Sequence, residues 1–470
     1  MLAKVAMLTA AVQRGPVAYR MNIESEELMK GYFQAAALIV LACLALVTVG
    51  RAQDQASTSP PSNDAILHQM QQLQDEVRAL QAEVTALKAA PAPAAATAAP
   101  AATPPAAAAV ASSSAPAAAP APTGLAGLLG PTTLSGFVDT YYGYNSNHPS
   151  TRQNGLRNFD VNSNQFGLNM IELVADKSVD NTNRVGYHVA LGFGQAMNMV
   201  NGGELGFDQY LKEGYIEYMA PVGKGLQINV GKFVTPAGAE VIESKDNWNY
   251  SRSLLFSWAI PYFHFGASAK YAFNSKFAVT GYVVNGWNNS VDNNTGKTAG
   301  FSAAWTPTPK FSIIETYLGG PEQSGNNSDF RHLSDTVITY NPTAKLSFMA
   351  NYDYGHESIG PALGQAFTVA KWSGLAGYVK YAPNDKWTVA LRGEYFDDNQ
   401  GWSTGTAQEL SEFTGTLQRT LSSKILTRLE FRRDMTGART FLRGPADTPV
   451  SGQNTVALGF IYAFSSADAK

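Results

Sequence analysis

Between residues 132 and 464, apolar and polar positions alternate one by one in runs of about ten residues. The segment "KILTRLEFR" illustrates the pattern, because its alternate positions form one apolar row and one charged row. The apolar row holds Ile425, Leu429 and Phe431, and the charged row holds Arg428, Glu430 and Arg432. A period of two with one apolar side indicates a β-strand that separates two environments.

Two kinds of protein contain such strands. In a soluble β-sandwich the apolar row would form the core, whereas in an outer-membrane barrel it meets lipid and the polar row meets a water-filled lumen. Strands of about ten residues, aromatic residues at strand ends and connections that alternate between short and long favour the barrel. The sequence therefore predicts an all-β transmembrane barrel, in which Leu429→Arg should cost more stability than Arg428→Leu.

One short connection recurs with an aromatic residue before it and a lysine at its end, as in "YAPNDKWTV" and "YNPTAKLSF". Proline and asparagine suit tight turns, and the flanking aromatic rings suit headgroup depth. Such short turns are predicted at 177–184, 221–225, 274–276, 307–310, 342–345, 383–386 and 422–424. Seven short turns on one side of a closed barrel predict about 16 antiparallel strands over residues 132–464, and residues 465–470 are then a C-terminal tail.

The segment before the barrel begins with an export signal. An apolar run, "AAALIVLACLALVTV", occupies residues 35–49 and is followed by small residues around Arg51. This pattern predicts a signal peptide within residues 1–52, with cleavage after Ala52. The run is too short for a typical membrane-spanning helix.

Residues 63–88 show a different periodicity. Apolar residues recur at alternating spacings of four and three, at Ile66, Met70, Leu73, Val77, Leu80, Val84 and Leu87. This heptad stripe predicts a coiled-coil helix, and the alternative is an amphipathic helix that packs on the main domain. Residues 89–131 are rich in alanine and proline, so we expect a linker without a core of its own.

Composition narrows the range of functions. The formal net charge of −3 gives no basic excess, so we expect no nucleic-acid partner. The only cysteine, Cys43, lies in the predicted signal peptide, which leaves no thiol for a disulfide or a metal site in the mature chain. The six histidines show no ligand spacing, and no serine, histidine and acidic residue can be grouped as a triad. We therefore expect no metal, no cofactor and no catalysis.

Several blocks of the chain suggest a family. These are "LSGFVDTYYGYNSNHP", "NFDVNSNQFGLNMIELVADK", "NVGKFVTPAGAEVIESKDNWNYSRSLLFSWAIPYFHFGA" and the ending "GFIYAF". Over roughly residues 132–464 the chain resembles the OmpL-like β-barrel porins of Gram-negative bacteria. The resemblance implies an outer-membrane channel and names no substrate. The chain departs from the usual aromatic terminus of such barrels, since Phe464 is followed by "SSADAK".

The longest insertion between predicted strands runs from Pro236 to Pro261. The third loop of general porins folds into the lumen, and the resemblance implies the same here. Folding inward would bury the apolar stretch "SLLFSWAIP". The candidate constriction consists of loop residues Glu240, Glu243, Asp246 and Arg252 and wall residues Arg392, Arg428 and Arg432. Acidic groups opposite arginines would create a field across the pore, unless these charges are only solvated or paired with each other.

These observations support two functions from different classes. The first is a porin in outer-membrane lipid that lets small polar solutes diffuse passively. The alternative is a structural tether, in which the coiled coil and linker contact the cell wall from the periplasm and the barrel serves as an anchor. General porins of this barrel size are usually trimers, so the resemblance implies a homotrimer.

Overall fold

The computed structural model describes residue 130, residues 132–360 and residues 368–469. The predicted signal peptide with its cleavage site at Ala52, the coiled coil at 63–88 and most of the linker at 89–131 lie outside the described residues. These three predictions therefore stay predictions.

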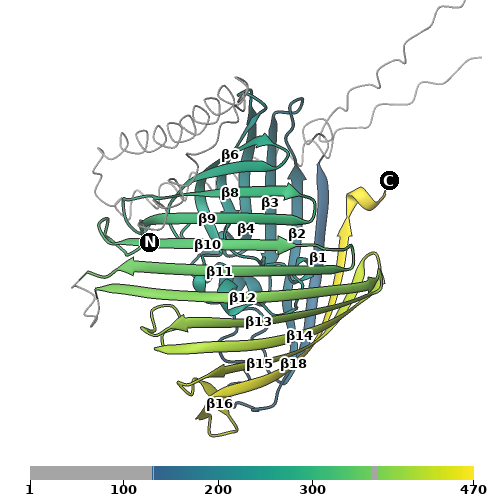
Figure 1. Cartoon of the computed structure of the whole chain (residues 1–470), viewed down its shortest axis with the longest axis vertical. Coiled ribbons are helices and arrows are strands. Elements are labelled where there is room, and N and C mark those ends of the chain that lie inside the picture. Colours follow the sequence, from purple (N-terminus) through teal and green to yellow (C-terminus); the bar gives the residue numbers. More distant parts are fainter. Residues whose placement is uncertain (1–129, 131, 361–367, 470) are drawn as a thin grey trace, which may run out of the picture. The chain divides into compact units, whose positions relative to one another are not determined.

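The described chain forms a closed barrel of sixteen antiparallel strands, as the alternation predicted (Figure 1). The strands are β1 (Thr133–Asn145), β2 (Gln165–Lys177), β3 (Val185–Phe193), β4 (Leu211–Ala220), β5 (Leu226–Val234), β6 (Phe263–Asn274), β7 (Phe277–Val284), β8 (Thr298–Thr308), β9 (Phe311–Pro321), β10 (Phe330–Tyr340), β11 (Leu346–Ser358), β12 (Val369–Asn384), β13 (Trp387–Asp398), β14 (Gln408–Ser422), β15 (Ile425–Thr436) and β18 (Gly452–Ser465). Each strand pairs with its neighbour in the chain, and β1 pairs with β18 to close the sheet.

The seven predicted short turns all join consecutive strands at one end of the barrel. Their sequence explains their shape. The side-chain oxygen of Asn384 accepts hydrogen bonds from the backbone N–H groups of Lys386 (2.9 Å) and Trp387 (3.1 Å). The side-chain oxygen of Asn274 likewise accepts from the backbone N–H groups of Lys276 (2.8 Å) and Phe277 (3.0 Å). An asparagine that bonds the backbone two and three residues ahead favours a tight turn.

The other end of the barrel carries the long connections. The loop between β15 and β18 contains a small hairpin of β16 (Phe441–Arg443) and β17 (Thr448–Val450). The short helices are α5 (Gln195–Val200), η1 (Gly206–Gln209), η2 (Ser244–Asp246), η3 (Leu255–Ala259) and, after the last strand, η5 (Ser466–Ala469). Within the part of the chain that the structure describes, no helix is long and apolar enough to cross a membrane.

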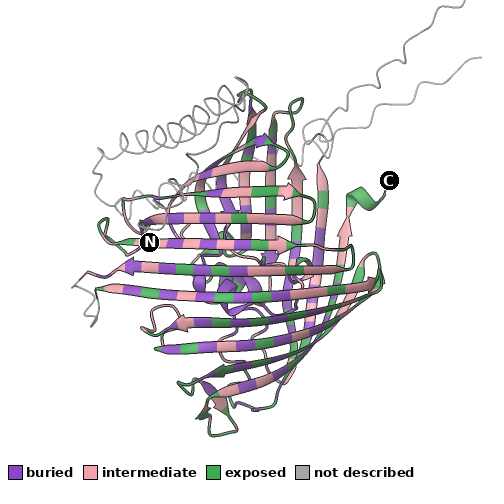
Figure 2. Cartoon of the chain, in the orientation of Figure 1, coloured by how far each residue is buried: buried purple, intermediate pink, exposed green. Residues whose placement is uncertain are grey.

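Burial alternates along the strands as the sequence pattern predicted (Figure 2). On β15, Leu429 is 50% exposed whereas Arg428 beside it is 2% exposed. The exposed face of the barrel is therefore apolar, and the charged row points to the lumen. The buried apolar cluster of the molecule also lies in the lumen, around the long loop between β5 and β6. A barrel this wide cannot be filled by wall side chains alone, so a loop is needed to build that core.

Candidate functional site

The connection from Thr235 to Tyr262, here called loop 3, lies inside the barrel. Its backbone is held by carboxylates of the barrel wall. The N–H of Gly238 donates to Asp335 on β10 (3.0 Å), and the N–H of Leu254 donates to Glu394 on β13 (2.7 Å). Because these two strands are separated around the wall by β11 and β12, loop 3 is fixed at more than one point of the lumen.

The apolar part of loop 3 packs against the wall. Leu254, Leu255 and Phe256 are buried, as expected for an inward fold. The indole N–H of Trp372 on β12 donates to the carbonyl of Ala259 (3.0 Å). Burial of a leucine or phenylalanine side chain stabilises a fold by roughly 1.5–3 kcal/mol, so this stretch favours the inward position.

Arg392 on β13 connects loop 3 to the barrel wall, because its side chain contacts one carboxylate of the loop and another of the wall. Its guanidinium, which is fully buried, lies 2.7 Å from Glu240 of loop 3 and 2.7 Å from Glu412 on β14. It also donates to the carbonyl of Ser251 (2.8 Å). The planar guanidinium suits this arrangement, because its donors can reach several oxygens at once.

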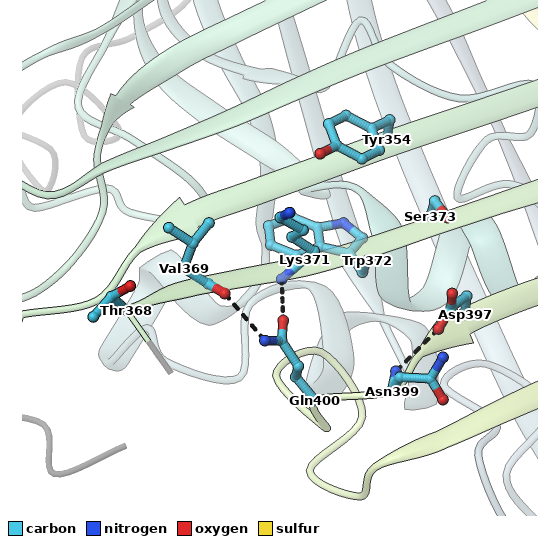
Figure 3. Close-up of a pocket in the computed structure, with 9 residues that line it drawn as sticks. All are labelled: Tyr354, Thr368, Val369, Lys371, Trp372, Ser373, Asp397, Asn399 and Gln400. Atoms are coloured by element: carbon cyan, nitrogen blue, oxygen red, sulfur yellow. Dashed lines mark hydrogen bonds between the residues drawn. The ribbon is translucent and has the colours of Figure 1, made fainter. Parts of the chain in front are cut away.

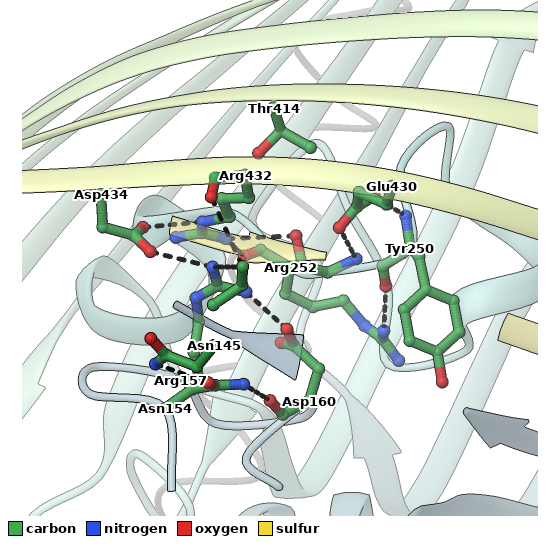
Figure 4. Close-up of polar contacts among 12 residues, drawn as sticks. Asn145, Asn154, Arg157, Asp160, Tyr250, Arg252, Thr414, Glu430, Arg432 and Asp434 are labelled. Atoms are coloured by element: carbon green, nitrogen blue, oxygen red, sulfur yellow. Dashed lines mark hydrogen bonds and ion pairs between the residues drawn. The ribbon is translucent and has the colours of Figure 1, made fainter. Parts of the chain in front are cut away.

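Arg432 lies on β15, two strands beyond β13, and Figure 4 shows it beside Asp434. It donates to Asp434 (2.7 Å) and to the carbonyl of Arg252 in loop 3 (2.6 Å). Asp434 in turn accepts from Arg157 (2.8 Å), which lies in the loop between β1 and β2 and also bonds Asp160 (2.5 Å). The network therefore joins two loops to one strand.

Arg428 and Glu430 form hydrogen bonds with backbone groups of loop 3, which is not part of any strand. Arg428 donates to the carbonyls of Asn247 (2.7 Å) and Asn249 (3.1 Å), and Glu430 accepts from the N–H of Tyr250 (2.5 Å). An irregular segment buried inside a barrel has many such groups, and each costs free energy if it is left unpaired. The charged row of β15 thus serves as hydrogen-bond partner for loop 3.

The two remaining acidic candidates differ in their surroundings. Glu243 forms an ion pair with Lys212 on β4, which also contacts Glu172 on β2. Burial alone would raise the pKa of Glu243, but the Lys212 ammonium overrides it and lowers that pKa below its usual value. Asp246, in contrast, has a side chain that is 53% exposed, with Lys245 at 2.5 Å.

The sequence of the chain also matches a known protein family. Residues 131–464 match the family described as "Putative beta-barrel porin-2, OmpL-like". The chain belongs to this family. The resemblance drawn from the sequence is thereby confirmed, and the chain is a β-barrel porin of the outer membrane. No curated protein sequence matches the chain.

Solved structures with a similar fold include two porins and an outer-membrane channel. An anion-selective porin from Comamonas acidovorans shares 11% identity, with 71% of this chain and 99% of that chain covered and a TM-score of 0.49. Salmonella typhi OmpF in complex with daunomycin shares 13% identity, with coverage of 71% and 97% and a TM-score of 0.48. The outer-membrane channel DcaP of Acinetobacter baumannii shares 11% identity, with coverage of 71% and 97% and a TM-score of 0.46.

Of the seven candidate constriction residues, five are buried in this porin, namely Glu240, Arg252, Arg392, Arg428 and Arg432. Glu240 meets Arg392 directly, and the carbonyl of Arg252 meets Arg432. The arginines of the wall therefore touch loop 3 itself. Glu243 is tied to the opposite wall through Lys212, and Asp246 is the candidate with the most solvent contact.

Sequence reasoning missed a charged group on β2, β3 and β4 of the porin barrel. Lys212 and Glu172 belong to it, together with Glu213, which lies 3.4 Å from Lys212. His188 on β3 is 2.9 Å from Asp176 on β2. Glu172, Asp176 and Glu213 stand in the polar rows of "QFGLNMIELVADK" and "LKEGYIEYMA", so the alternation could have revealed them. Lys212 directly precedes Glu213 and is out of phase with that row, so the alternation does not reveal it.

The porin also has a surface pocket outside the lumen, of about 580 Å³ (Figure 3). It lies on the outer side of β12 and β13 near the long-loop end, and Tyr354, Lys371 and Asp397 line it. Gln400 closes one side by bonding the backbone N–H of Lys371 (2.7 Å). Among the described residues, no histidine, cysteine or acidic side chains are grouped so as to hold a metal ion.

Proposed function

We propose that this porin is a passive channel for small hydrophilic solutes, with its lumen narrowed by loop 3 and without a catalytic step. The observation that carries the proposal is the fixation of loop 3 across the lumen. Wall residues on β4, β10, β13 and β15 all bond it, through Lys212, Asp335, Arg392 and Arg428. A loop held at so many points has a defined position, which a size-selective constriction requires.

The partners of the candidate residues favour a second possible origin of ion selectivity, beside the predicted field between acidic groups and arginines. Buried pairs such as Glu240 with Arg392 compensate each other over short distances and project little field into the water. Charges that remain in solvent contact act at longer range. We propose that Asp246 and Lys245 of loop 3 and Lys270 on the lumen side of β6 set a weak ion preference. This interpretation suits a channel for small polar solutes of either sign.

Assembly and the N-terminal segment belong to the same proposal. We propose a homotrimer, with the coiled coil of residues 63–88 in the periplasm, where the short turns of such barrels lie. Since that segment is outside the described residues, the tether to the cell wall stays an alternative prediction. Chemical cross-linking of the full chain tests the assembly. A ladder that ends at three copies supports the trimer, and monomers alone contradict it.

Planar-bilayer recording of the purified full chain tests the channel. We expect stepwise conductance that is linear in voltage and liposome swelling that is faster with small sugars than with large ones. Heat-modifiable migration on gels serves as the control for a folded barrel. A folded barrel that neither conducts ions nor admits sugars would contradict the proposed channel function and favour the alternative, a barrel that serves as a membrane anchor.

A further inference from the structure

Three arginines gather at a second surface pocket, of about 420 Å³, at the long-loop end of β15 and β18. They are Arg433 on β15, Arg439 in the following loop and Arg443 on β16. Thr448 and Ser451 add side-chain hydroxyl groups to the lining. The pocket is thus positively charged and rich in hydrogen-bond donors, unlike the pocket near Lys371, which contains Asp397.

The position of Arg433 places this pocket beside the membrane. Along the outer row of β15, Leu429 and Phe431 are exposed and apolar, and Arg433 is the next residue of that row toward the long loops. Its cross-strand neighbour is Asn454 on β18, to whose side-chain oxygen it donates (3.0 Å). Met435, the residue after Arg433 in this row, is also exposed. A polar pair next to an aromatic residue near the long-loop end suits the level where lipid tails give way to headgroups.

These arginines also differ from the lumen arginines in their partners. Among the described residues, none of the three lies within ion-pair distance of a carboxylate, whereas Arg392 meets three carboxylates and Arg432 meets two. The Arg443 guanidinium donates to an amide oxygen, that of Asn147 (3.4 Å). Three cations gathered without a counter-charge repel each other, and an anion in the pocket would remove that cost.

We propose that this pocket binds the phosphate of a phosphorylated glycolipid headgroup from the outer leaflet. The guanidinium groups would bond the phosphate oxygens in the forked geometry that arginine favours, and the hydroxyl groups would meet the sugar. The volume suits a headgroup of this kind, because small-molecule pockets span about 300–1,000 Å³. A membrane lipid is favoured over free phosphate because Arg433 belongs to the lipid-facing row. The proposal does not depend on channel activity.

Native mass spectrometry of the full chain in detergent, with added bisphosphorylated lipid A, tests the site. The variant is Arg433→Gln, Arg439→Gln and Arg443→Gln together, and Arg433→Lys alone provides a milder change that keeps the charge. The matched control is Arg419→Gln. Arg419 is also exposed on the outer face, but at the short-turn end of β14, where it stacks on Trp387 at 5.1 Å.

We expect the triple variant to bind lipid A roughly tenfold to a hundredfold more weakly, with the Arg419→Gln control unchanged. Dephosphorylated lipid A should bind the wild-type chain as weakly as the triple variant binds the intact lipid. Inorganic phosphate at millimolar concentration should not displace the lipid. Equal retention of lipid A by the wild type and the folded triple variant would overturn the proposal. Displacement by phosphate alone would overturn the assignment to a lipid.

Discussion

Strand β15 has two faces that meet different partners. Its outer residues, such as Leu429 and Phe431, are exposed and apolar, as a row that faces lipid requires. Its inner residues, one position away along the chain, are buried against loop 3. The outer face needs only to be apolar, because lipid offers one uniform environment. The inner face must match individual atoms, since Arg428 and Arg432 each bond particular carbonyls of loop 3.

Because their partners differ, we expect the two faces of β15 to respond differently to substitution. An outer apolar residue can be exchanged for another apolar residue at little cost. An inner charged residue cannot be exchanged without leaving a partner buried and unpaired. The inner face is therefore the more specific of the two, although the sequence pattern of both faces is equally simple.

The largest effect is expected at the inner face. Arg392→Leu would leave Glu240 and Glu412 without their shared cation, because Arg392 lies 2.7 Å from each. Breaking a buried ion pair by removing one partner costs about 3–5 kcal/mol. We expect a loss of that size in the free energy of unfolding, measured by urea titration in lipid vesicles. Arg419→Leu on the outer face serves as the control and should cost about 0.5 kcal/mol or less. Equal costs at the two positions would contradict the comparison.

The next effect is expected at the outer face. Leu429→Arg should cost about 2–4 kcal/mol, because it places a charge in the lipid-facing row. Leu429→Met keeps the volume and the apolar character, and it should cost less than about 1.5 kcal/mol. The same urea titration measures both. A Leu429→Arg variant as stable as the Leu429→Met control would mean that this row does not face lipid.

A smaller loss is expected for Arg428→Leu, and here the structure changes the expectation from sequence. A lumen charge surrounded by water could be replaced with almost no loss of stability. Arg428, in contrast, is buried and donates hydrogen bonds to the carbonyls of Asn247 and Asn249. Groups left unpaired by its removal cost about 1–3 kcal/mol. We expect a loss in that range by urea titration, and a loss near zero would mean that loop 3 does not rest on this side chain.

The strands and turns could be predicted because their causes are local. The alternation on β15 places Arg428 inward whatever the rest of the chain does, and Asn384 shapes its turn through atoms two and three residues ahead. Strand number followed from counting such turns.

The partners inside the lumen could not be predicted in the same way. The path of loop 3 among strands distant in the sequence determines which charges meet. Arg392 pairs with Glu240 and Lys212 pairs with Glu243 only because of that path. An irregular loop has no period from which its path can be calculated. The sequence supplied the inward row and the loop that lies in the lumen, whereas the atoms that contact each other could be found only from the structure.

The smallest effect is expected for the ion preference. Asp246→Asn removes a half-exposed charge of loop 3, so the reversal potential under a salt gradient should shift by a few millivolts toward anion preference. Asp292→Asn, in the loop between β7 and β8, should leave it unchanged at physiological salt, where screening acts over about 8 Å. An equal shift in both variants would contradict a role for loop 3 in selectivity.

The central claim is that loop 3, held by the charged inner row, narrows the pore. Its most direct test is the single-channel conductance of a variant that lacks residues 244–253, compared with one that lacks residues 289–294 of the loop between β7 and β8. Gel migration before and after heating confirms that each barrel is folded. The account predicts that the first deletion roughly doubles the conductance and that the second leaves it near the wild-type value. A folded barrel whose conductance is unchanged by the first deletion would contradict it.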